Sequence, residues 1–403
     1  MLPTLTRPLL TRPLLTRRGA LLGLTAAVSL GRVSLAMAAA PTDRRFVVVL
    51  LRGAMDGLAV VSPYGDPALA GLRGAMAPKR PGEQDGLLDL GGYFGLHPAL
   101  TGLHGMYTAG DLLPVHAVAG PVRTRSHFEA QDIMESGADH RMNSGWLNRA
   151  VQGMAQAGPN GAPIAIGVAL PLLLRGPAAV GAYAPQSFQQ PQPDLYARLV
   201  ALHAHDPVTG PAIREGLQER GFTGATLHGI DPGPQKYAFP ALAAAAGHLL
   251  AAPDGPRIAA MELGGWDTHA AQAQRLVAPL TQLDQGLVAL RDALGPAWRQ
   301  TAVLVITEFG RTAHVNGTNG TDHGTGAASF VLGGAVAGGH VRADWPGLAD
   351  SQLFEGRDLA PSMDVRGLAK GLLSAHLQLP PAALARAFPG SDGVSPVGRL
   401  IRA

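Results

Sequence analysis

Several apolar runs of this chain each lead into a short cluster of polar side chains that can bind a metal ion or act as a nucleophile. The first of them, residues 46–51, is apolar at every position, as expected of a central parallel strand that is buried on both faces. The carboxyl ends of such strands lie together at one edge of an open sheet, where ligands bind. The runs and the polar residues after them are 46–51 with Asp56, 114–119 with Arg125, Ser126 and His127, 257–263 with Asp267 and His269, and 302–306 with Glu308, Arg311, Asp322 and His323.

The convergence of these residues on one edge predicts a metal-dependent hydrolytic site. Carboxylates, imidazoles and a hydroxyl are the groups that bind a divalent ion and attack an ester. The chain contains no nucleophile elbow, phosphate-binding loop or dinucleotide-binding fingerprint, which are the motifs of competing chemistries. Hydrolysis is therefore favoured over hydride transfer.

Strand-like runs alternate with helical segments, which predicts an α/β fold with a mostly parallel central sheet. Leucines recur on one stripe of residues 279–294, and Gly295 with Pro296 follows as a stop signal. This helix would connect the runs 257–263 and 302–306 as a βαβ crossover. Further predicted elements are a helix over 126–135 and strands over 164–170 and 329–332.

A single large domain is expected over residues 41–403, because 46% of the chain is hydrophobic and only 15% is charged. The region 176–240 differs from the rest, since a Pro- and Gln-rich stretch is followed by helical segments. We interpret this region as a helical insertion that covers one edge of the sheet.

The first 40 residues have the pattern of a twin-arginine (Tat) signal peptide. Arg17 and Arg18 precede an apolar stretch that ends at Val33, and small residues follow at 36–40. An uncleaved membrane anchor is the alternative, but a span needs about 20 apolar residues and Arg32 interrupts this one. We therefore expect the Tat translocase as a partner during export, a periplasmic or secreted location, and no stable membrane span in the mature protein.

Charge and cysteine content exclude several classes of protein. Residues 1–40 contain five Arg and no acid, so their removal changes the formal charge from +3 to 3 − 5 = −2. A mildly acidic protein gives no argument for nucleic-acid binding. The chain has no cysteine, which excludes disulfides, thiolate metal ligands and a formylglycine sulfatase made from cysteine. A metal must then be held by Asp, Glu, His, hydroxyl or backbone oxygen.

Two candidate residues have structural alternatives of equal weight. Asp56 precedes Gly57 and is either a turn residue or a metal-binding carboxylate. Ser126 and Glu129 have the spacing of a capping box, yet a hydroxyl at a helix N-terminus is also well placed to act as a nucleophile. Both interpretations of Ser126 can hold together, and Arg125 could bind an anionic group of the substrate.

The later clusters favour metal binding more strongly. Asp267 and His269 lie two residues apart after a Gly-Gly pair, so they can bind the same ion. The alternative is that Asp267 caps the next helix. Glu308 could pair with a nearby arginine instead of a metal, and His323 lies in a glycine-rich loop of the kind that approaches ligands.

Taken together, six segments resemble a bacterial family of unknown function numbered 1501, which is grouped with the alkaline phosphatase-like superfamily. The resemblance implies the three-layer α/β/α fold of that superfamily and no known substrate. The segments are LRGAMDGLAVVSPYGDP, RSHFEAQDIMESG, GWLNRA, GGWDTHAAQ, TEFGRTAHVNGTNGTDHGTGA and FVLGGAVAGGHV.

The same resemblance implies roles for individual residues and shows two departures. It implies that Ser126 is the nucleophile. The metal ligands that it implies are Asp56, Asp267, His269, Glu308 and His323. Asp267 and His269 are closer in sequence than is usual in the superfamily. Phe309 stands where the second residue of an Asp-His pair is normally histidine, so a second metal site would lose a ligand. His127 or Asp322 could compensate for that loss.

These observations predict an exported, metal-dependent hydrolase of phosphate or sulfate esters, acting on a small molecule or a component of the cell envelope. Zinc is the favoured cofactor, with manganese, magnesium and calcium also compatible. One alternative is a non-catalytic periplasmic or surface protein that kept the fold without the chemistry. A further alternative is a hydrolase or transferase that acts on substituents of cell-wall carbohydrate.

The export pattern gives the first prediction. Replacing Arg17 and Arg18 together by lysine should trap the protein in the cytoplasm, because they are the only tandem arginines of the leader. Fractionation of cells that express the wild type and the double variant measures this. Unchanged recovery of the variant from the periplasm would count against the Tat pathway.

Overall fold

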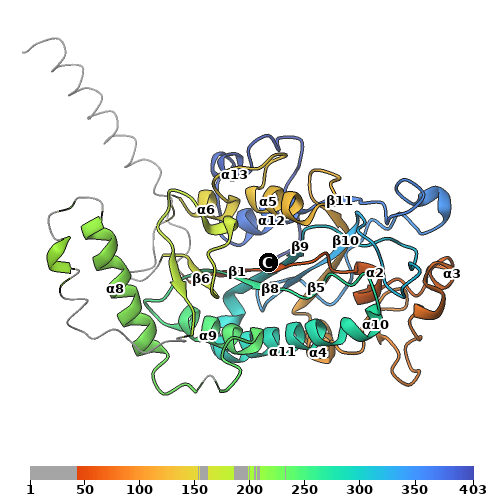
Figure 1. Ribbon diagram of the computed structural model, residues 1–403, viewed down its shortest axis with the longest axis horizontal. Coiled ribbons are helices and arrows are strands. Elements are labelled where there is room, and N and C mark those ends of the chain that lie inside the picture. The colour runs from red at the N-terminus through yellow and green to blue at the C-terminus, as the bar shows by residue number, and fades with distance from the viewer. Residues whose placement is uncertain are drawn as a thin grey trace, which may run out of the picture.

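The structure, a computed structural model, describes residues 43–152, 154, 162–185, 198, 200–203, 206, 209–231 and 233–403. The predicted signal peptide at 1–40 lies outside these residues, as does most of the Pro- and Gln-rich stretch. An eight-stranded sheet with the order β11-β5-β10-β9-β1-β8-β6-β7 forms the centre, and helices cover both of its faces (Figure 1).

The sheet is mostly parallel, as predicted. Strand β10 pairs antiparallel with β5 and β9, while the other pairs of this sheet are parallel. The carboxyl ends of β1, β8 and β9 therefore share one edge. The strands are β1 (Arg45–Leu51), β5 (Leu112–Ala119), β6 (Ile164–Ile166), β7 (Gly181–Tyr183), β8 (Ile258–Leu263), β9 (Thr301–Thr307), β10 (Ala327–Leu332) and β11 (Met363–Asp364).

Two hydrophobic cores lie on opposite faces of the sheet, because successive side chains of a strand point to opposite sides. On β1, Val47 and Val49 belong to one core, and Phe46 and Val48 belong to the other. One core includes residues of α4 (Thr101–Thr108), α9 (Phe239–Ala251) and α11 (Val277–Leu294). The other includes residues of α5 (His127–Ser136), α6 (Trp146–Val151), α12 (Val365–Ala375) and α13 (Pro381–Ala387). The predicted three-layer α/β/α architecture is confirmed.

Shorter elements complete the described chain. Strands β2, β4 and β3 form a second, three-stranded sheet. Helix α8 (Thr209–Thr226) is as long as α11. The short elements are α2 (Gly57–Val60), β2 (Val61–Ser62), α3 (Leu69–Arg73), η1 (Gly74–Met76), β3 (Leu88–Asp89), β4 (Gly95–Leu96), η2 (Leu172–Leu174), α10 (Gln272–Arg275), η3 (Gly295–Gln300) and η4 (Asp350–Gln352). Among the described residues, no helix has both the length and the apolar character needed to cross a bilayer.

The predicted elements can be compared with the observed ones. The crossover helix is α11, and it connects two strands that both pair with β1. Strand β6 is shorter than the predicted strand 164–170, because Gly167 has a φ of +135° and the chain turns there. The region 176–240 supplies β7, which is itself an edge strand of the sheet, before it supplies helix α8.

Two buried histidines of the core are held in the neutral form. His116 on β5 donates from Nε2 to the carbonyl of Val61 at 2.8 Å, and His376 donates from Nε2 to the carbonyl of Arg45 at 2.9 Å. Burial lowers the pKa of each imidazole from 6.5 to about 4. Both side chains are therefore uncharged at neutral pH.

We expect these histidines to make the protein sensitive to acid. The unfolded chain binds more protons than the folded chain between pH 6.5 and about 4, so their contribution is present above pH 6.5 and is lost as the pH falls. Each contributes about 3 kcal/mol at most, from 1.36 kcal/mol per unit of pKa. Urea unfolding at pH 7 and pH 4.5 tests this, and His376→Gln should show a smaller pH dependence than wild type. An equal pH dependence in the two proteins would contradict the assignment.

Candidate metal centre

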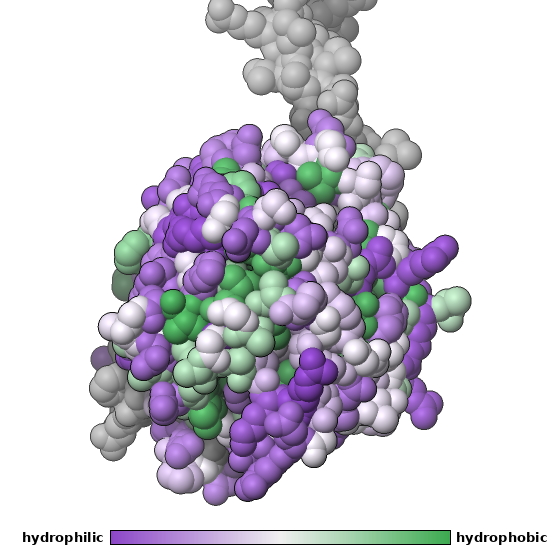
Figure 2. Space-filling view, turned by 90° about the vertical axis from the view of Figure 1, so that its right-hand side faces the viewer, coloured by the Kyte–Doolittle hydropathy of each residue, from purple (hydrophilic) through white to green (hydrophobic). Residues whose placement is uncertain are grey.

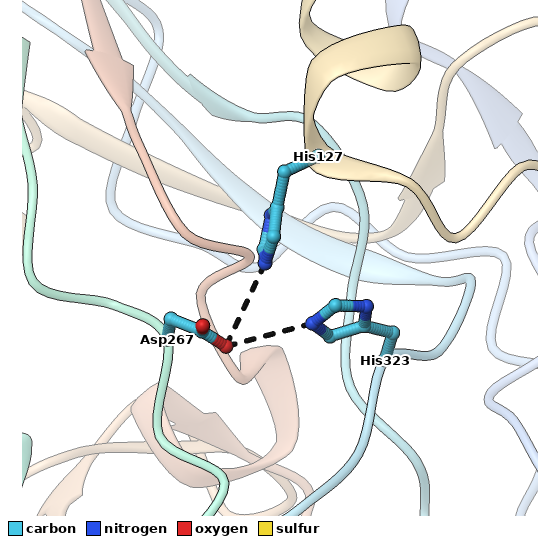
Figure 3. A group of neighbouring side chains, drawn as sticks. All are labelled: His127, Asp267 and His323. Carbon is cyan, nitrogen blue, oxygen red and sulfur yellow. Dashed lines mark ion pairs between the residues drawn. The ribbon is translucent and has the colours of Figure 1, made fainter.

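Side chains from three segments that are distant in sequence meet at the carboxyl edge of the sheet. His127 begins α5, Asp267 follows β8, and His323 lies between β9 and β10. One possible ligand atom of each lies within 4.8 Å of the others. Asp267 Oδ1 is 3.6 Å from His127 Nε2 and 3.5 Å from His323 Nε2 (Figure 3). The structure thus brings together two of the expected ligands and one of the two residues expected to compensate.

His269 lies next to this group and contacts two of its members, Asp267 and His323. Its Nε2 lies 3.1 Å from Asp267 Oδ1 and 2.9 Å from His323 Nε2. Asp267 and His269, which are two residues apart in sequence, therefore face the same point. Three imidazole nitrogens and one carboxylate oxygen make up the centre.

Each of the three imidazoles has its other ring nitrogen bound to an acceptor. Because these partners are a carboxylate or a carbonyl, each Nδ1 donates a hydrogen bond, and each ring turns its Nε2 toward the centre. The contacts are His127 Nδ1 to Glu308 Oε1 at 2.8 Å, His269 Nδ1 to Asp322 Oδ1 at 3.1 Å, and His323 Nδ1 to the carbonyl of Arg125 at 2.8 Å.

The contacts around Asp267, and the one between His269 and His323, have the spacing expected around a tetrahedral metal ion. The ligand atoms that all lie within 4.8 Å of one another are those of His127, Asp267 and His323. Zinc binds imidazole and carboxylate at about 2.0–2.1 Å, which separates neighbouring ligand atoms by about 3.3 Å. The contacts given above range from 2.9 to 3.6 Å. The buried Nε2 of His127 has no hydrogen-bond partner among the described residues, and lone pairs that face one another repel unless a cation lies between them. The donor set therefore fits a divalent ion such as zinc.

Glu308 orients His127 from behind the centre, and its expected role as a metal ligand stays a prediction. Its Oε1 accepts hydrogen bonds from His127, from Gln131 Nε2 at 2.9 Å and from the N–H of Gly53 at 2.9 Å. Its Oε2 accepts from the hydroxyl of Thr307 at 3.0 Å. Burial alone would raise the pKa of Glu308, but the hydrogen bonds from His127 and Gln131 lower it. The ionised carboxylate in turn raises the pKa of His127.

Arg311 anchors Asp267 from inside the protein. Its fully buried guanidinium contacts Asp267 Oδ1 and donates to the carbonyls of Gly53, Ala54 and Thr321 at 2.8–2.9 Å. Burial would raise the pKa of Asp267, but Arg311 lowers it by hydrogen bonding and by its charge. Arg311 thus pairs with Asp267 and keeps it ionised, instead of pairing with Glu308 as the sequence suggested.

Phe309 forms an apolar wall of the centre at the position where the superfamily usually has histidine. Its ring centroid lies 5.0 Å from that of His127 and 5.1 Å from that of His323. The side chain is buried. An aromatic ring offers no ligand atom, so this side of the centre supports the imidazoles by packing alone.

Asp56 does not belong to the centre, because other groups occupy its oxygens. It accepts two hydrogen bonds from the terminal nitrogens of Arg73, at 2.5 and 2.9 Å, and one from Gln272 Nε2 at 2.6 Å. It also caps α2 by accepting from the N–H groups of Leu58 and Ala59. In this structure Asp56 is a fully buried partner of Arg73 and a helix cap, and its expected role as a metal ligand stays a prediction.

Arg125 contributes its backbone to the centre, and its charge is already paired. The guanidinium donates to Asp358 Oδ2 at 2.7 and 3.1 Å and to Glu355 Oε2 at 2.7 Å. Two carboxylates therefore occupy the group that was expected to bind an anionic substrate. The carbonyl of Arg125 fixes the orientation of His323 instead.

Ser126 has extended backbone angles and immediately precedes α5, but its side chain makes no capping hydrogen bond. The predicted capping box is not formed, because Glu129 accepts from the hydroxyl of Thr124 at 2.6 Å. Ser126 is exposed and lies between Arg125 and His127, both of which contact the centre. Its hydroxyl is therefore free for chemistry.

The sequence contained a usable signal for one residue that we did not predict. Gln131 lies four residues after His127, and this spacing places both side chains on one face of a helix, where both reach Glu308. The carbonyl of Arg125 and the buried pair of Asp56 with Arg73 had no comparable signal.

A family model described as a protein of unknown function (DUF1501) matches residues 113–383. The structure is similar to the C-terminal periplasmic domain of EcEptC from Escherichia coli in complex with zinc, with 10% sequence identity and a TM-score of 0.34, over 73% of this chain and 74% of that chain. It is also similar to BT1596, a 2-O GAG sulfatase, with 11% identity and a TM-score of 0.28, over 72% of this chain and 64% of that chain. No curated protein matches the sequence.

The geometry predicts the effect of single substitutions on metal binding. His127→Ala and His323→Ala should each remove tight zinc binding, and Glu308→Gln should weaken it about 10- to 100-fold, because it loosens the orientation of a ligand. His140→Ala, which changes an exposed histidine paired with Asp139, is the matched control. Competition with a chelator measures the affinity for zinc. This affinity should fall at acid pH, because the imidazoles must be neutral to bind the ion. Wild-type affinity in His323→Ala would exclude this centre.

Proposed function

This chain belongs to the DUF1501 family of proteins of unknown function, and we propose from its metal centre that it hydrolyses phosphate or sulfate esters. One observation carries the proposal: three imidazoles present Nε2 to one carboxylate oxygen at a place that solvent can reach. The side chains of Asp267 and His269 are 48% and 43% exposed. Catalytic zinc sites have three protein ligands and keep a fourth position for water or substrate, and His127, Asp267 and His323 form such a group of three.

The residues that would hold the ion are His127, Asp267, His269 and His323. Zinc is favoured because its ligands are nitrogen and oxygen atoms at tetrahedral spacing. Manganese, magnesium and calcium are further candidates. A bound divalent ion would supply positive charge beside the oxygens of the ester and would activate a nucleophile at neutral pH.

Ser126 is the proposed nucleophile. Its two neighbours in sequence, Arg125 and His127, both contact the centre, so the backbone places Ser126 between two residues of the site. It also stands at the N-terminus of the ten-residue helix α5, which favours negative charge. Attack of Ser126 Oγ on phosphorus or sulfur would form a serine ester and break the bond to the alcohol, which takes up the hydroxyl proton. Water would then hydrolyse the serine ester and restore Ser126.

The proposal also includes the location of the enzyme and the class of its substrate. The Tat-type leader supports a periplasmic or secreted enzyme, and the substrate would be a small-molecule ester or an ester of the cell envelope. The net charge of −2 without the leader, as calculated above from five Arg, disfavours nucleic acid as a partner.

Phe309 favours a second candidate, a metal-binding protein without catalysis. Many enzymes that transfer phosphoryl groups use two ions about 3.5–4 Å apart, and Phe309 offers no ligand for a second ion. Assays of the zinc-loaded protein with phosphate and sulfate esters separate the two candidates. Bound metal without turnover of any ester would support the non-catalytic protein.

A substitution of Ser126 tests whether its hydroxyl is the nucleophile. Because Ser126 makes no capping bond, Ser126→Ala should leave the melting temperature and the bound metal unchanged. It should lower kcat for p-nitrophenyl phosphate or sulfate by orders of magnitude. Glu129→Gln is the control, since it removes the other residue of the supposed capping box and should remain active. A fully active Ser126→Ala protein would show that water or another residue attacks the ester.

A further inference from the structure

A small pocket lies beside α2, α3 and α10, away from the metal ligands. Its volume is about 140 Å³, and none of the four metal ligands lines it. These helices lie at the right-hand end of the molecule in Figure 1. Figure 2 shows the surface of that end, where apolar residues lie near the middle and hydrophilic residues surround them. The apolar walls of the pocket include Leu58, Met76, Pro78, Leu87, Pro98 and Leu276.

Arg73 lines this pocket and has one unused hydrogen-bond donor. Its side chain is 2% exposed, and Asp56 takes both of its terminal nitrogens. The remaining nitrogen, Nε, is buried and has no hydrogen-bond partner among the described residues. Nearly all buried donors in native proteins are paired, so this group indicates a ligand with an acceptor atom.

Two further donors lie on the wall of the same pocket. His97 accepts the N–H of Ala99 at Nδ1, at 3.2 Å, so its Nε2 carries the proton. Burial lowers the pKa of His97, which keeps the ring neutral. Lys79 binds the carbonyl of Gln84 at 2.9 Å and has no carboxylate partner in the part of the chain that the structure describes.

We propose that this pocket binds a small monocarboxylate with a short apolar tail. Arg73, His97 and Lys79 would donate to the carboxylate, and the apolar walls would contact the tail. The volume is below the ~300–1,000 Å³ of pockets for drug-sized ligands, so the ligand has only a few heavy atoms. Asp85 also lines the pocket, and its charge disfavours a ligand with a second negative charge, such as a phosphate dianion.

Hydrogen bonds connect this pocket to the two loops that carry metal ligands. Asp56 links Arg73 to Gln272, whose Oε1 accepts from the hydroxyls of Thr268 at 2.8 Å and Thr321 at 2.6 Å. Thr268 lies between two metal ligands in sequence, and Thr321 lies two residues before a third. A carboxylate on Arg73 would therefore sit at the end of a chain of contacts that reaches both loops.

Ligand-observed NMR with butyrate, acetate and inorganic phosphate as probes tests the proposal on the full-length protein. Ala273→Leu fills the pocket from exposed helix α10, and Gln274→Leu adds the same side chain at a neighbouring position outside it. Lys79→Met removes the cation, and Arg80→Met is its control. Wild type should bind butyrate, and Ala273→Leu and Lys79→Met should each weaken the Kd by about tenfold or more. Both controls should bind as wild type.

Three results would overturn the proposal: wild type that does not saturate with butyrate, Ala273→Leu that binds butyrate as well as Gln274→Leu does, or phosphate that binds as tightly as butyrate. The measurement does not depend on the metal centre. Asp267→Ala without zinc should still bind butyrate, so failure of this proposal is distinguishable from failure of the proposed function.

Discussion

The buried guanidinium of Arg311 is the interaction on which the metal centre depends. It donates to the carbonyls of Gly53 and Ala54 after β1 and to that of Thr321 before β10, and it contacts Asp267 after β8. A buried charge is costly unless it is paired and hydrogen-bonded, and Arg311 satisfies this condition with groups from three loops. The same contacts that stabilise the charge therefore fix the relative positions of the loops.

Each imidazole of the centre is oriented by a hydrogen-bond acceptor on its far side, and the three acceptors differ in kind. A buried carboxylate directly after β9 orients His127, an exposed carboxylate orients His269, and a main-chain carbonyl orients His323. Each contact selects the tautomer whose Nε2 is free. Ligands that are oriented in advance lose less freedom when an ion binds, which increases affinity.

The sequence predicted the sheet and its functional edge better than it predicted individual roles. Strands β1, β8 and β9 were predictable because they are buried along their length except at Glu262 of β8, and mostly apolar runs satisfy that condition. The role of Asp56 was not, because its partner Arg73 lies in a segment with no pattern that indicates a buried arginine. A carboxylate that binds a metal and one that orients a histidine look alike in sequence, so the hydrogen bond of Glu308 with His127 could not be predicted.

The ring of Phe309 gives the candidate centre a wall that can neither exchange a proton nor bind an ion. It packs against the imidazoles of His127 and His323, and it is itself buried. A substitution at this one position would therefore disturb both imidazoles together. A polar side chain placed there would also lose its contact with water, which costs free energy unless the imidazoles accept or donate a hydrogen bond to it.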